Sequence, residues 1–365
     1  MGPPPLERIA VNNHCSGRRK ETVIHFGWYH LPVITVSLRR LLQCLVLLLL
    51  SSTVTLASTY SNSTTVIVVV GAAGEPEFGS NFVHQANLWQ AACSRADCRC
   101  IIIGLDAEAQ TNDFTRLQQT LATETNDGPA QLWLVLIGHG TFDGKEARFN
   151  LRGPDVSTTD LALWLRPFNR PLALIDAASC SAPFLNKLSG TNRVVITATR
   201  TGNEQYYARF GQYFAETVTD PEADLDKDGQ VSLLEAFLAA SARTAQFYKA
   251  EGRIATEHAL LDDNGDGLGT PADWFRGLRA VRRAKENAPV DGLLAGQFCL
   301  VPSDSERSLT GEQRVRRDAL ERAVLVFREK KAVLPEDEYY GQLEKLLLDL
   351  ARFYSANTPQ PSPRP

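Results

Sequence analysis

The sequence predicts an α/β protein with a mostly parallel central sheet that is covered by helices on both faces. Between residues 65 and 218, short apolar runs rich in β-branched residues alternate with stretches of helical apolar spacing. Near-continuous apolar strands of this kind are typical of parallel sheets buried on both faces. The chain has 365 residues, 44% of them hydrophobic, which is enough for one sizeable domain plus appendages. With a net charge of −4 and no basic stripe, nucleic acid is not an expected partner.

Five strands are expected, and each is too short and too apolar to be an amphipathic helix. They lie at residues 65–70, 100–103, 132–137, 172–175 and 193–198. Helical apolar spacing predicts one helix from Phe82 to Ser94 and another from Phe114 to Thr123. A further helix after the fifth strand carries Tyr207, Phe210, Tyr213 and Phe214.

The first 57 residues are predicted to be a secretory signal peptide with a long charged region before its apolar core. Arg39 and Arg40 precede the apolar run from Leu41 to Leu50, and a small-residue pattern ends at Ala57. Cleavage there predicts a secreted or periplasmic protein. A wrongly assigned start codon is an alternative explanation of the long leading region, since Met1 is the only methionine. The alternative location is an uncleaved membrane anchor, although the apolar run is short for a span of about 20 residues.

Export changes the interpretation of the cysteines. Removal of the leader leaves five, namely Cys93, Cys98, Cys100, Cys180 and Cys299. Four of them can pair, and Cys180 is the candidate for the remaining free thiol. Alternatively, the three cysteines at 93, 98 and 100 hold a metal together with His84, although the spacing matches no common zinc pattern.

Two segments place reactive side chains at strand ends. His139 stands between Gly138 and Gly140 after the third expected strand, and Cys180 follows the fourth among small residues. Because consecutive parallel strands expose their carboxyl ends at one edge, we expect both side chains in one crevice. A thiol and an imidazole together suit a nucleophile and its base. The plainer alternatives are a buried apolar cysteine and a turn histidine, but the flanking glycines and small residues leave room for a ligand.

An acidic segment after the expected sheet matches the twelve-residue EF-hand calcium loop. The expected ligands are Asp224, Asp226, Asp228, the backbone carbonyl of Gln230, Ser232 and Glu235. The alternative is an acidic turn that caps the helix beginning near Ser232. A weaker second match would use Asp262, Asn264, Asp266, Thr270 and Asp273. Its alternative is a glycine-rich loop whose side chains bind its own backbone. Calcium would be structural or regulatory here and is not needed for the chemistry.

The domain organisation follows from these patterns. We expect a main domain at 58–218, a calcium-binding segment at 219–275, a return to the main domain at 276–303, a helical hairpin at 304–356 and a disordered tail at 357–365. Apolar residues at helical spacing form one seam in the hairpin, with Pro335 at its turn. The seam residues are Leu320, Val324, Phe327, Leu343, Leu347 and Leu350. The seam can serve docking on the main domain, self-association or a protein partner.

The order strand, His-Gly, strand, small residues, Cys resembles the caspase-like clan of cysteine peptidases, and it is most similar to the legumain family. The stretch Val83-His84-Gln85-Ala86-Asn87 resembles the His-Gln-Ala-Asp stretch that opens the first helix of legumains. The resemblance covers roughly residues 65–215. It implies a caspase-like three-layer sandwich and a polypeptide substrate. His84 itself is interpreted as structural.

The resemblance implies a role for each matched residue. Cys180 would be the nucleophile, His139 would transfer protons, and the backbone amides of Gly140 and Cys180 would face the oxyanion of an acyl-transfer reaction. Glu204, after the fifth strand, lies where this clan places residues of its primary specificity pocket, which suggests a basic residue before the scissile bond. A solvated glutamate at a helix start is the alternative.

Two departures affect the expected specificity and function. The loop between Gly71 and His84 is longer than in legumains, and Val83 replaces an arginine, so cleavage after asparagine is not expected by default. The function that the sequence predicts is an exported cysteine endopeptidase, with calcium as a modulator that orders the segment beside the crevice. The alternative is a catalytically inactive caspase-like scaffold that binds calcium and a partner.

Overall fold

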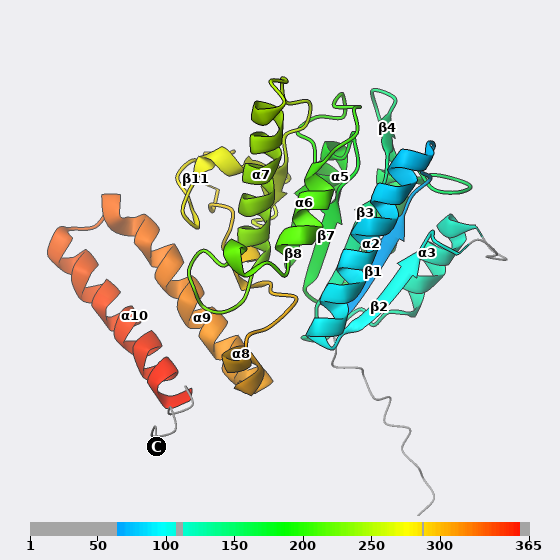
Figure 1. The fold of residues 1–365 in the computed structure, drawn as a ribbon. Helices are drawn as coiled ribbons and strands as arrows, with labels where there is room; N and C mark the ends of the chain where they lie inside the picture. Colours follow the sequence, from blue (N-terminus) through cyan, green and yellow to red (C-terminus); the bar gives the residue numbers. More distant parts are fainter. Residues whose placement is uncertain (1–63, 107–111, 287, 358–365) are drawn as a thin grey trace, which may run out of the picture. The chain divides into compact units, whose positions relative to one another are not determined.

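The structure is a computed structural model that describes residues 64–106, 112–286 and 288–357 (Figure 1). A seven-stranded sheet forms its centre. The strand order is β10-β9-β8-β7-β3-β1-β2. Five neighbouring strands are parallel, namely β1 (Thr65–Val70), β2 (Arg99–Ile103), β3 (Leu132–Ile137), β7 (Leu172–Asp176) and β8 (Arg193–Thr197). The predicted mostly parallel sheet is therefore confirmed. The predicted leader and most of the predicted tail lie outside the described residues.

Helices cover both faces of this sheet (Figure 1). One face carries α2 (Pro76–Ala96), α6 (Phe210–Thr217) and α7 (Leu233–Ala250). The other carries α3 (Asp113–Thr123), α4 (Thr158–Leu165) and α5 (Ala182–Leu188). Strand residues alternate between two apolar cores, so that Val66 and Val68 of β1 face the first set and Ile67 faces the second. This is the three-layer α/β arrangement that the sequence predicts.

The helix α2 begins six residues before the predicted start. The stretch between Gly71 and His84, expected to be a long loop, is therefore mostly helical, and that expectation was wrong. Pro76 occupies the first turn, where its fixed backbone angle suits a helix and its missing N–H is not needed. Glu77 in the same turn complements the helix dipole. Phe78 and Phe82, four residues apart, then lie on one face of the helix.

A small antiparallel sheet that the sequence did not predict follows β3. It consists of β4 (Gly140–Phe142), β5 (Ala147–Phe149) and β6 (Val156–Ser157). These strands of two or three residues are too short to give a periodic pattern. Because β4 begins directly after His139, this sheet fixes one side of the histidine's loop.

The segment 219–275, which is expected to bind calcium, also completes the central sheet. Its strands β9 (Leu260–Asp262) and β10 (Thr270–Pro271) add antiparallel to the edge at β8. Before them, η1 (Pro221–Ala223) and the loop 224–235 lead into α7. After them come η2 (Ala272–Trp274), the ribbon of β11 (Phe275–Arg276) and β12 (Arg279–Ala280), and η3 (Ala295–Gln297).

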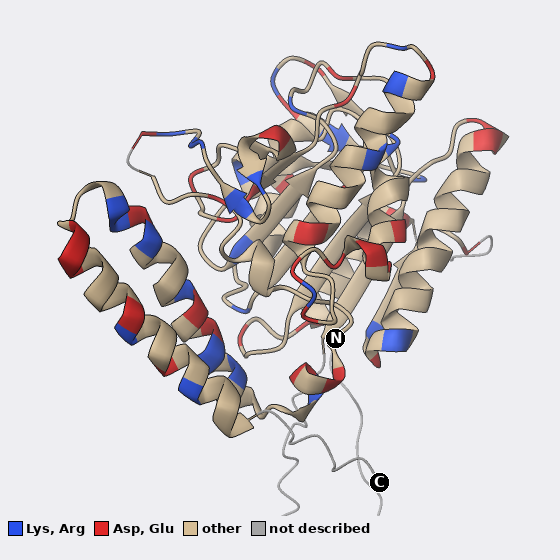
Figure 2. Cartoon of the chain, turned by 60° about the vertical axis from the view of Figure 1, so that its left-hand side comes forward, with Lys and Arg blue, Asp and Glu red and all other residues tan. Residues whose placement is uncertain are grey.

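The C-terminal residues form helices as predicted. They are α8 (Asp304–Ser308), α9 (Gly311–Arg328), the short η4 (Glu329–Ala332) and α10 (Glu336–Asn357). Basic and acidic residues are interspersed along α9 and α10 (Figure 2). The seam differs from the predicted one: Val324 and Phe327 are buried, but Leu347 is 46% exposed. Tyr339, which was not expected in the seam, is buried and stacks on Phe327 with ring centroids 5.5 Å apart.

No helix in the described part of the chain combines the length and apolarity needed to cross a membrane.

Candidate active site

His139 lies in the short connection between β3 and β4, with its ring held by aromatic neighbours. Its centroid is 4.9 Å from that of Phe78 and 5.2 Å from that of Phe82, both on α2, in edge-to-face geometry. Its Nε2 lies 3.3 Å from the backbone oxygen of Ala73. Partial burial lowers the pKa of His139, and the Ala73 carbonyl opposes this shift. The imidazole is therefore biased toward its neutral form, which can accept a proton.

Cys180 follows β7 in a strained backbone conformation. Its φ of 56° lies in the left-handed region that non-glycine residues rarely adopt. The residue is only 1% exposed. Burial, with a further contribution from Asp176, raises the pKa of the thiol to about 11. At pH 7 only about one such thiol in ten thousand is ionised, so attack on a substrate requires a base.

The two segments are in direct contact. The Gly140 amide donates to Ser179 Oγ over 3.1 Å, and that hydroxyl lies 3.2 Å from the Gly140 backbone oxygen. A Cβ on Gly140 would sit 2.2 Å from the backbone oxygen of Ser179, so only glycine permits this approach. In the sheet, Leu136 pairs with Asp176. The structure thus brings the loops of His139 and Cys180 to one edge of the sheet.

Both amides expected to face an oxyanion already have partners within the chain. The Cys180 amide donates to the backbone oxygen of Glu204 over 2.9 Å. The Gly140 amide donates to the Ser179 hydroxyl. A substrate carbonyl can use these donors only after both hydrogen bonds have been exchanged. Sequence patterns carry no signal for such contacts, which depend on loop conformation.

Glu204 lies beside Cys180, but its carboxylate is engaged. Its Oε1 is 2.6 Å from Nδ1 of His258, and its Oε2 accepts from the Arg200 amide over 2.8 Å. A basic substrate side chain would therefore compete with His258 for this carboxylate. His258 precedes β9 and was not singled out in the sequence.

Asp176, the last residue of β7, is a further site residue that was not assigned a role from the sequence. Its side chain is fully buried, Oδ1 accepts from the Ala178 amide over 3.1 Å, and Oδ2 has no hydrogen-bond partner. Burial raises the pKa of this carboxyl to about 8. Asp176 ends an otherwise apolar strand directly before the Cys180 loop. This acidic residue at the end of an apolar run was the feature of the sequence that could have indicated a site residue.

Three carboxylates converge where the acidic loop after η1 meets the first turn of α7. Asp224, Asp226 and Glu235 each present one oxygen, and these oxygens lie within 4.8 Å of one another. Burial, then the charges of Asp228 and Glu235, raises the pKa of Asp226 to about 6. The carboxylate of Asp228 instead accepts from the backbone and side-chain amides of Gln230, each over 3.0 Å.

The alternative interpretation of this loop, a helix cap, is also present in the structure. Ser232 and Glu235 form a capping box at the start of α7, in which each side chain accepts the other's backbone N–H. Glu235 Oε1 accepts from the Leu225 and Asp226 amides, and its Oε2 accepts from the Ser232 amide and hydroxyl. A cation bound by Glu235 would have to displace part of this cap.

The second acidic loop mainly binds its own backbone. Asp262 accepts from the amides of Gly265 and Gly267 over 3.0 and 2.8 Å. Asn264 Oδ1 accepts from the Asp266 amide over 2.8 Å. The Thr270 hydroxyl donates to Asp291, and Asp273 lies in η2. In the described residues, the carboxylates at 262, 266 and 273 do not form a convergent group.

The remaining cysteines are unpaired in the described structure. The thiol of Cys93 contacts those of Cys98 and Cys100, and these contacts, with burial, raise the pKa of Cys93 well above its usual range. His84 is exposed on α2. No group with metal-ligand spacing is found among these residues in the part of the chain that the structure describes.

Comparison with known proteins gives similarity at the level of structure. No family model and no curated protein matches the sequence. The Drosophila initiator caspase Dronc is similar with 14% identity and a TM-score of 0.37, over 57% of this chain and 85% of Dronc. Caspase-1 from Spodoptera frugiperda is similar with 9% identity and a TM-score of 0.34, over 55% of this chain and 85% of that protein. The resemblance to legumains and to EF-hands stays a prediction.

Proposed function

We propose that this chain is a cysteine endopeptidase in which Cys180 is the nucleophile and His139 the proton-transfer group. The observation that carries the proposal is the contact between Gly140 and Ser179, which joins two reactive segments 41 positions apart at one sheet edge. Ligands of α/β proteins bind at such carboxyl ends of parallel strands. The strained backbone of Cys180 adds support, because strain of this kind clusters at functional sites.

Before substrate binds, Cys180 is expected to be a neutral thiol and His139 a neutral imidazole. Because the thiol of Cys180 has a raised pKa and His139 a lowered one, the proton stays on sulfur until a substrate arrives. Attack then transfers this proton to the imidazole while sulfur bonds to the peptide carbonyl carbon and the carbonyl oxygen takes up the electron pair. The imidazolium next protonates the leaving amine. Water, deprotonated by the imidazole, hydrolyses the resulting thioester.

The proposal includes a rearrangement on substrate binding. The amides of Gly140 and Cys180 would release Ser179 Oγ and the Glu204 backbone oxygen and turn to the oxyanion. Each lost hydrogen bond costs about 1 kcal/mol net, and each aligned oxyanion donor typically supplies a factor of about 100 to 1,000 in rate. The exchange is therefore favourable in the transition state.

Export and calcium modulation are parts of the same proposal. The predicted leader supports a secreted or periplasmic location, and a polypeptide is the substrate class. Helix α6 packs closely on the segment before Cys180, since a Cβ on Gly211 would lie 2.4 Å from the Cβ of Ala177. The same helix leads through η1 to the acidic loop, which supports a route for calcium modulation. Calcium that orders the acidic loop would thereby also order the segment before Cys180. Self-association or a partner would use exposed apolar residues of the hairpin such as Leu347, because Val324 and Phe327 of the expected seam are buried.

A peptide-library cleavage profile tests the proposal. We expect the wild-type protein and Cys98→Ala to cleave a common set of sites, whereas Cys180→Ala and His139→Ala do not. Cys98 is the matched control, because it is another unpaired thiol outside the candidate site. A comparison of cleavage profiles recorded with calcium and with chelator shows whether calcium changes the peptidase activity. Unchanged cleavage by Cys180→Ala would exclude the assigned nucleophile.

The second candidate is an inactive scaffold with the same fold. The occupied amides and the buried Cys180 thiol favour it, since neither is ready for a substrate in this conformation. It predicts no turnover on any peptide under any calcium concentration. A protein whose melting temperature rises with calcium but which cleaves nothing would support it.

A further inference from the structure

The end of helix α2 brings two cysteines together. Asp97, with a left-handed φ of 53°, terminates the helix. The Cys98 amide donates to the Cys93 backbone oxygen over 3.1 Å, and the Asp97 amide donates to the Ser94 backbone oxygen over 3.4 Å. This pair of bonds is the Schellman motif, in which the side chains of the two residues joined by the longer-range bond commonly meet. Cys93 and Cys98 occupy these two positions, and their thiols are in contact.

A third thiol lies beside this pair. Cys100 is in β2, two residues after Cys98, so both side chains point to the same face of the strand. Both are partly exposed and pack against the apolar core beneath α2. Cys93 belongs to that core and is only 1% exposed, and its thiol also contacts that of Cys100. Cys93 is therefore the central member of a cluster of three thiols.

The spacing of this cluster suits a disulfide and not a metal ion. Zinc binds thiolates at about 2.3 Å, so three sulfurs around one ion lie about 4 Å from one another. Within the described residues, the three cysteines do not form such a convergent group. A disulfide needs only two sulfurs, on residues whose Cα atoms lie about 4.4 to 6.8 Å apart. The hydrogen bond from Cys98 to Cys93 holds their backbones at about this spacing.

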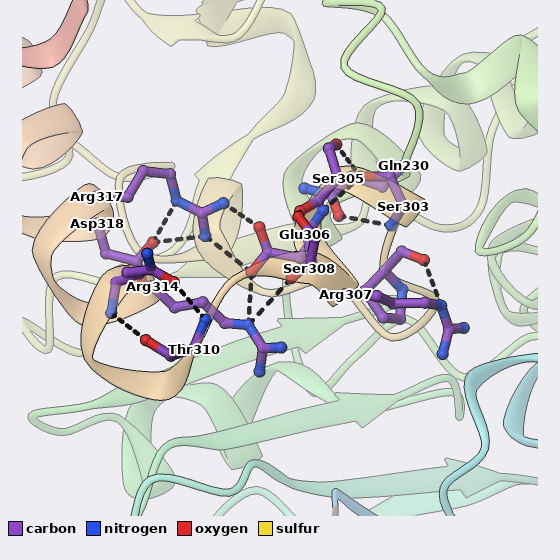
Figure 3. Close-up of polar contacts among 12 residues, drawn as sticks. Gln230, Ser303, Ser305, Glu306, Arg307, Ser308, Thr310, Arg314, Arg317 and Asp318 are labelled. Carbon is purple, nitrogen blue, oxygen red and sulfur yellow. Dashed lines mark hydrogen bonds and ion pairs between the residues drawn. The ribbon is translucent and has the colours of Figure 1, made fainter. Parts of the chain in front are cut away.

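The same turn of α2 is an attachment point for the base of the C-terminal hairpin. Arg307, on α8, donates to the backbone oxygen of Arg95 over 2.9 Å, and Arg95 lies in the last turn of α2. Its neighbour Glu306 forms ion pairs with Arg314 and Arg317 of α9 (Figure 3). A change in the order of this last turn can therefore reach the start of the hairpin through the hydrogen bond of Arg307.

We propose that Cys93 and Cys98 form a disulfide that locks the last turn of α2 and thereby steadies the start of the C-terminal hairpin. The oxidant is another disulfide, reached by thiol–disulfide exchange. The partly exposed Cys98 attacks one sulfur of the oxidant and releases one thiol. Cys93 then attacks the Cys98 sulfur, and its proton passes to the second thiolate that leaves.

The oxidant thus gains two electrons and two protons and becomes two thiols, while Cys100 stays a thiol. Exported proteins meet oxidants of this class. The role of the disulfide in the cell therefore rests on the proposed export, whereas its formation depends neither on export nor on peptidase activity.

Peptide mapping of the full chain tests the pair. The protein is reduced, treated with oxidised glutathione, alkylated and digested with trypsin. Cleavage after Arg95 and Arg99 places the three cysteines on separate peptides. We expect the Cys93 peptide joined to the Cys98 peptide, with Cys100 alkylated. Alkylation of both Cys93 and Cys98, glutathione adducts alone, or pairing of Cys93 with Cys100 would overturn the assignment.

Cys100→Ser is the matched control for the mapping. It removes the third thiol and should form the same disulfide at a rate within about 2-fold of the wild-type protein. Loss of the pair in this variant would also overturn the assignment. In the wild-type protein, oxidation should raise the melting temperature by about 4 °C. It should slow hydrogen exchange of the Cys98 amide by at least about 10-fold, because the last turn can then no longer fray.

Hydrogen exchange at α8 tests the link to the hairpin. Oxidation should slow exchange of the Arg307 amide by about 3-fold or more in the wild-type protein. Arg307→Ala should still form the disulfide but lose the effect of oxidation on α8, because it lacks the hydrogen bond to Arg95. Arg316→Ala, which removes an exposed arginine of α9, is the matched control and should keep the effect. Equal exchange at residues 304–308 in the oxidised and reduced wild-type protein would refute the link.

Discussion

Replacement of Asp176 by asparagine should change how stability depends on pH. The carboxyl is fully buried, and its pKa is raised from 3.8 to about 8 in the folded protein. Between these values the folded protein keeps a proton that the unfolded chain releases, so the free energy of unfolding falls as pH rises. One proton of difference corresponds to about 1.4 kcal/mol per pH unit. From pH 5 to pH 7 this group therefore removes roughly 3 kcal/mol of stability.

Asparagine keeps the Oδ1 acceptor for the Ala178 amide but does not titrate. The stability of Asp176→Asn relative to the wild-type protein should therefore increase by roughly 3 kcal/mol between pH 5 and pH 7. Urea denaturation at pH 5, 6 and 7 measures this difference, in which all other titrating groups cancel. Glu222→Gln, which removes an exposed carboxyl, is the control variant. A difference for Asp176→Asn that is constant within about 0.5 kcal/mol would refute the reasoning.

Three further substitutions probe the site and its support. Gly140→Ala would place a Cβ 2.2 Å from the backbone of the cysteine loop, so we expect loss of peptide cleavage by about 100-fold or more and a lower melting temperature. Arg170→Ala removes buried donors from the backbone oxygens of Ala130 and Gln131, while Glu124 keeps its ion pair with Arg99, so the free energy of unfolding should fall by about 1 to 3 kcal/mol in urea denaturation. His258→Ala frees Oε1 of Glu204, while Oε2 still accepts from the Arg200 amide. A cleavage profile should then shift toward lysine and arginine before the scissile bond, and an unchanged profile would remove Glu204 from the specificity pocket.

The sequence predicted the strands well because burial on both faces leaves a continuous apolar run. The expected bounds of β1 and β3 agree with the structure, and those of β7 and β8 differ by one residue. The start of α2 was missed, because proline and glutamate at positions 76 and 77 look like loop residues unless they are recognised as a helix N-terminus. The strands β9 and β10 were missed because their few residues flank an acidic loop that dominates the local pattern.

The location of the candidate site could be predicted, but its hydrogen bonds could not. The topological rule for parallel strands was sufficient to bring His139 and Cys180 to one edge. The hydrogen-bond partners of the Gly140 and Cys180 amides depend on loop conformations, and hydrophobic periodicity in the sequence does not predict these. The engagement of Glu204 by His258 spans 54 positions and was equally invisible in the sequence.

The central claim is that Cys180 is a nucleophile served by His139. Reaction with a library of peptide-linked thiol-directed electrophiles, read by peptide mass spectrometry, tests it most directly. We predict covalent labelling at Cys180 that falls by at least about 10-fold in His139→Ala, because the thiol then has no base to take its proton. Labelling confined to Cys98 or another cysteine, or labelling of Cys180 at the same rate in both proteins, would contradict the claim.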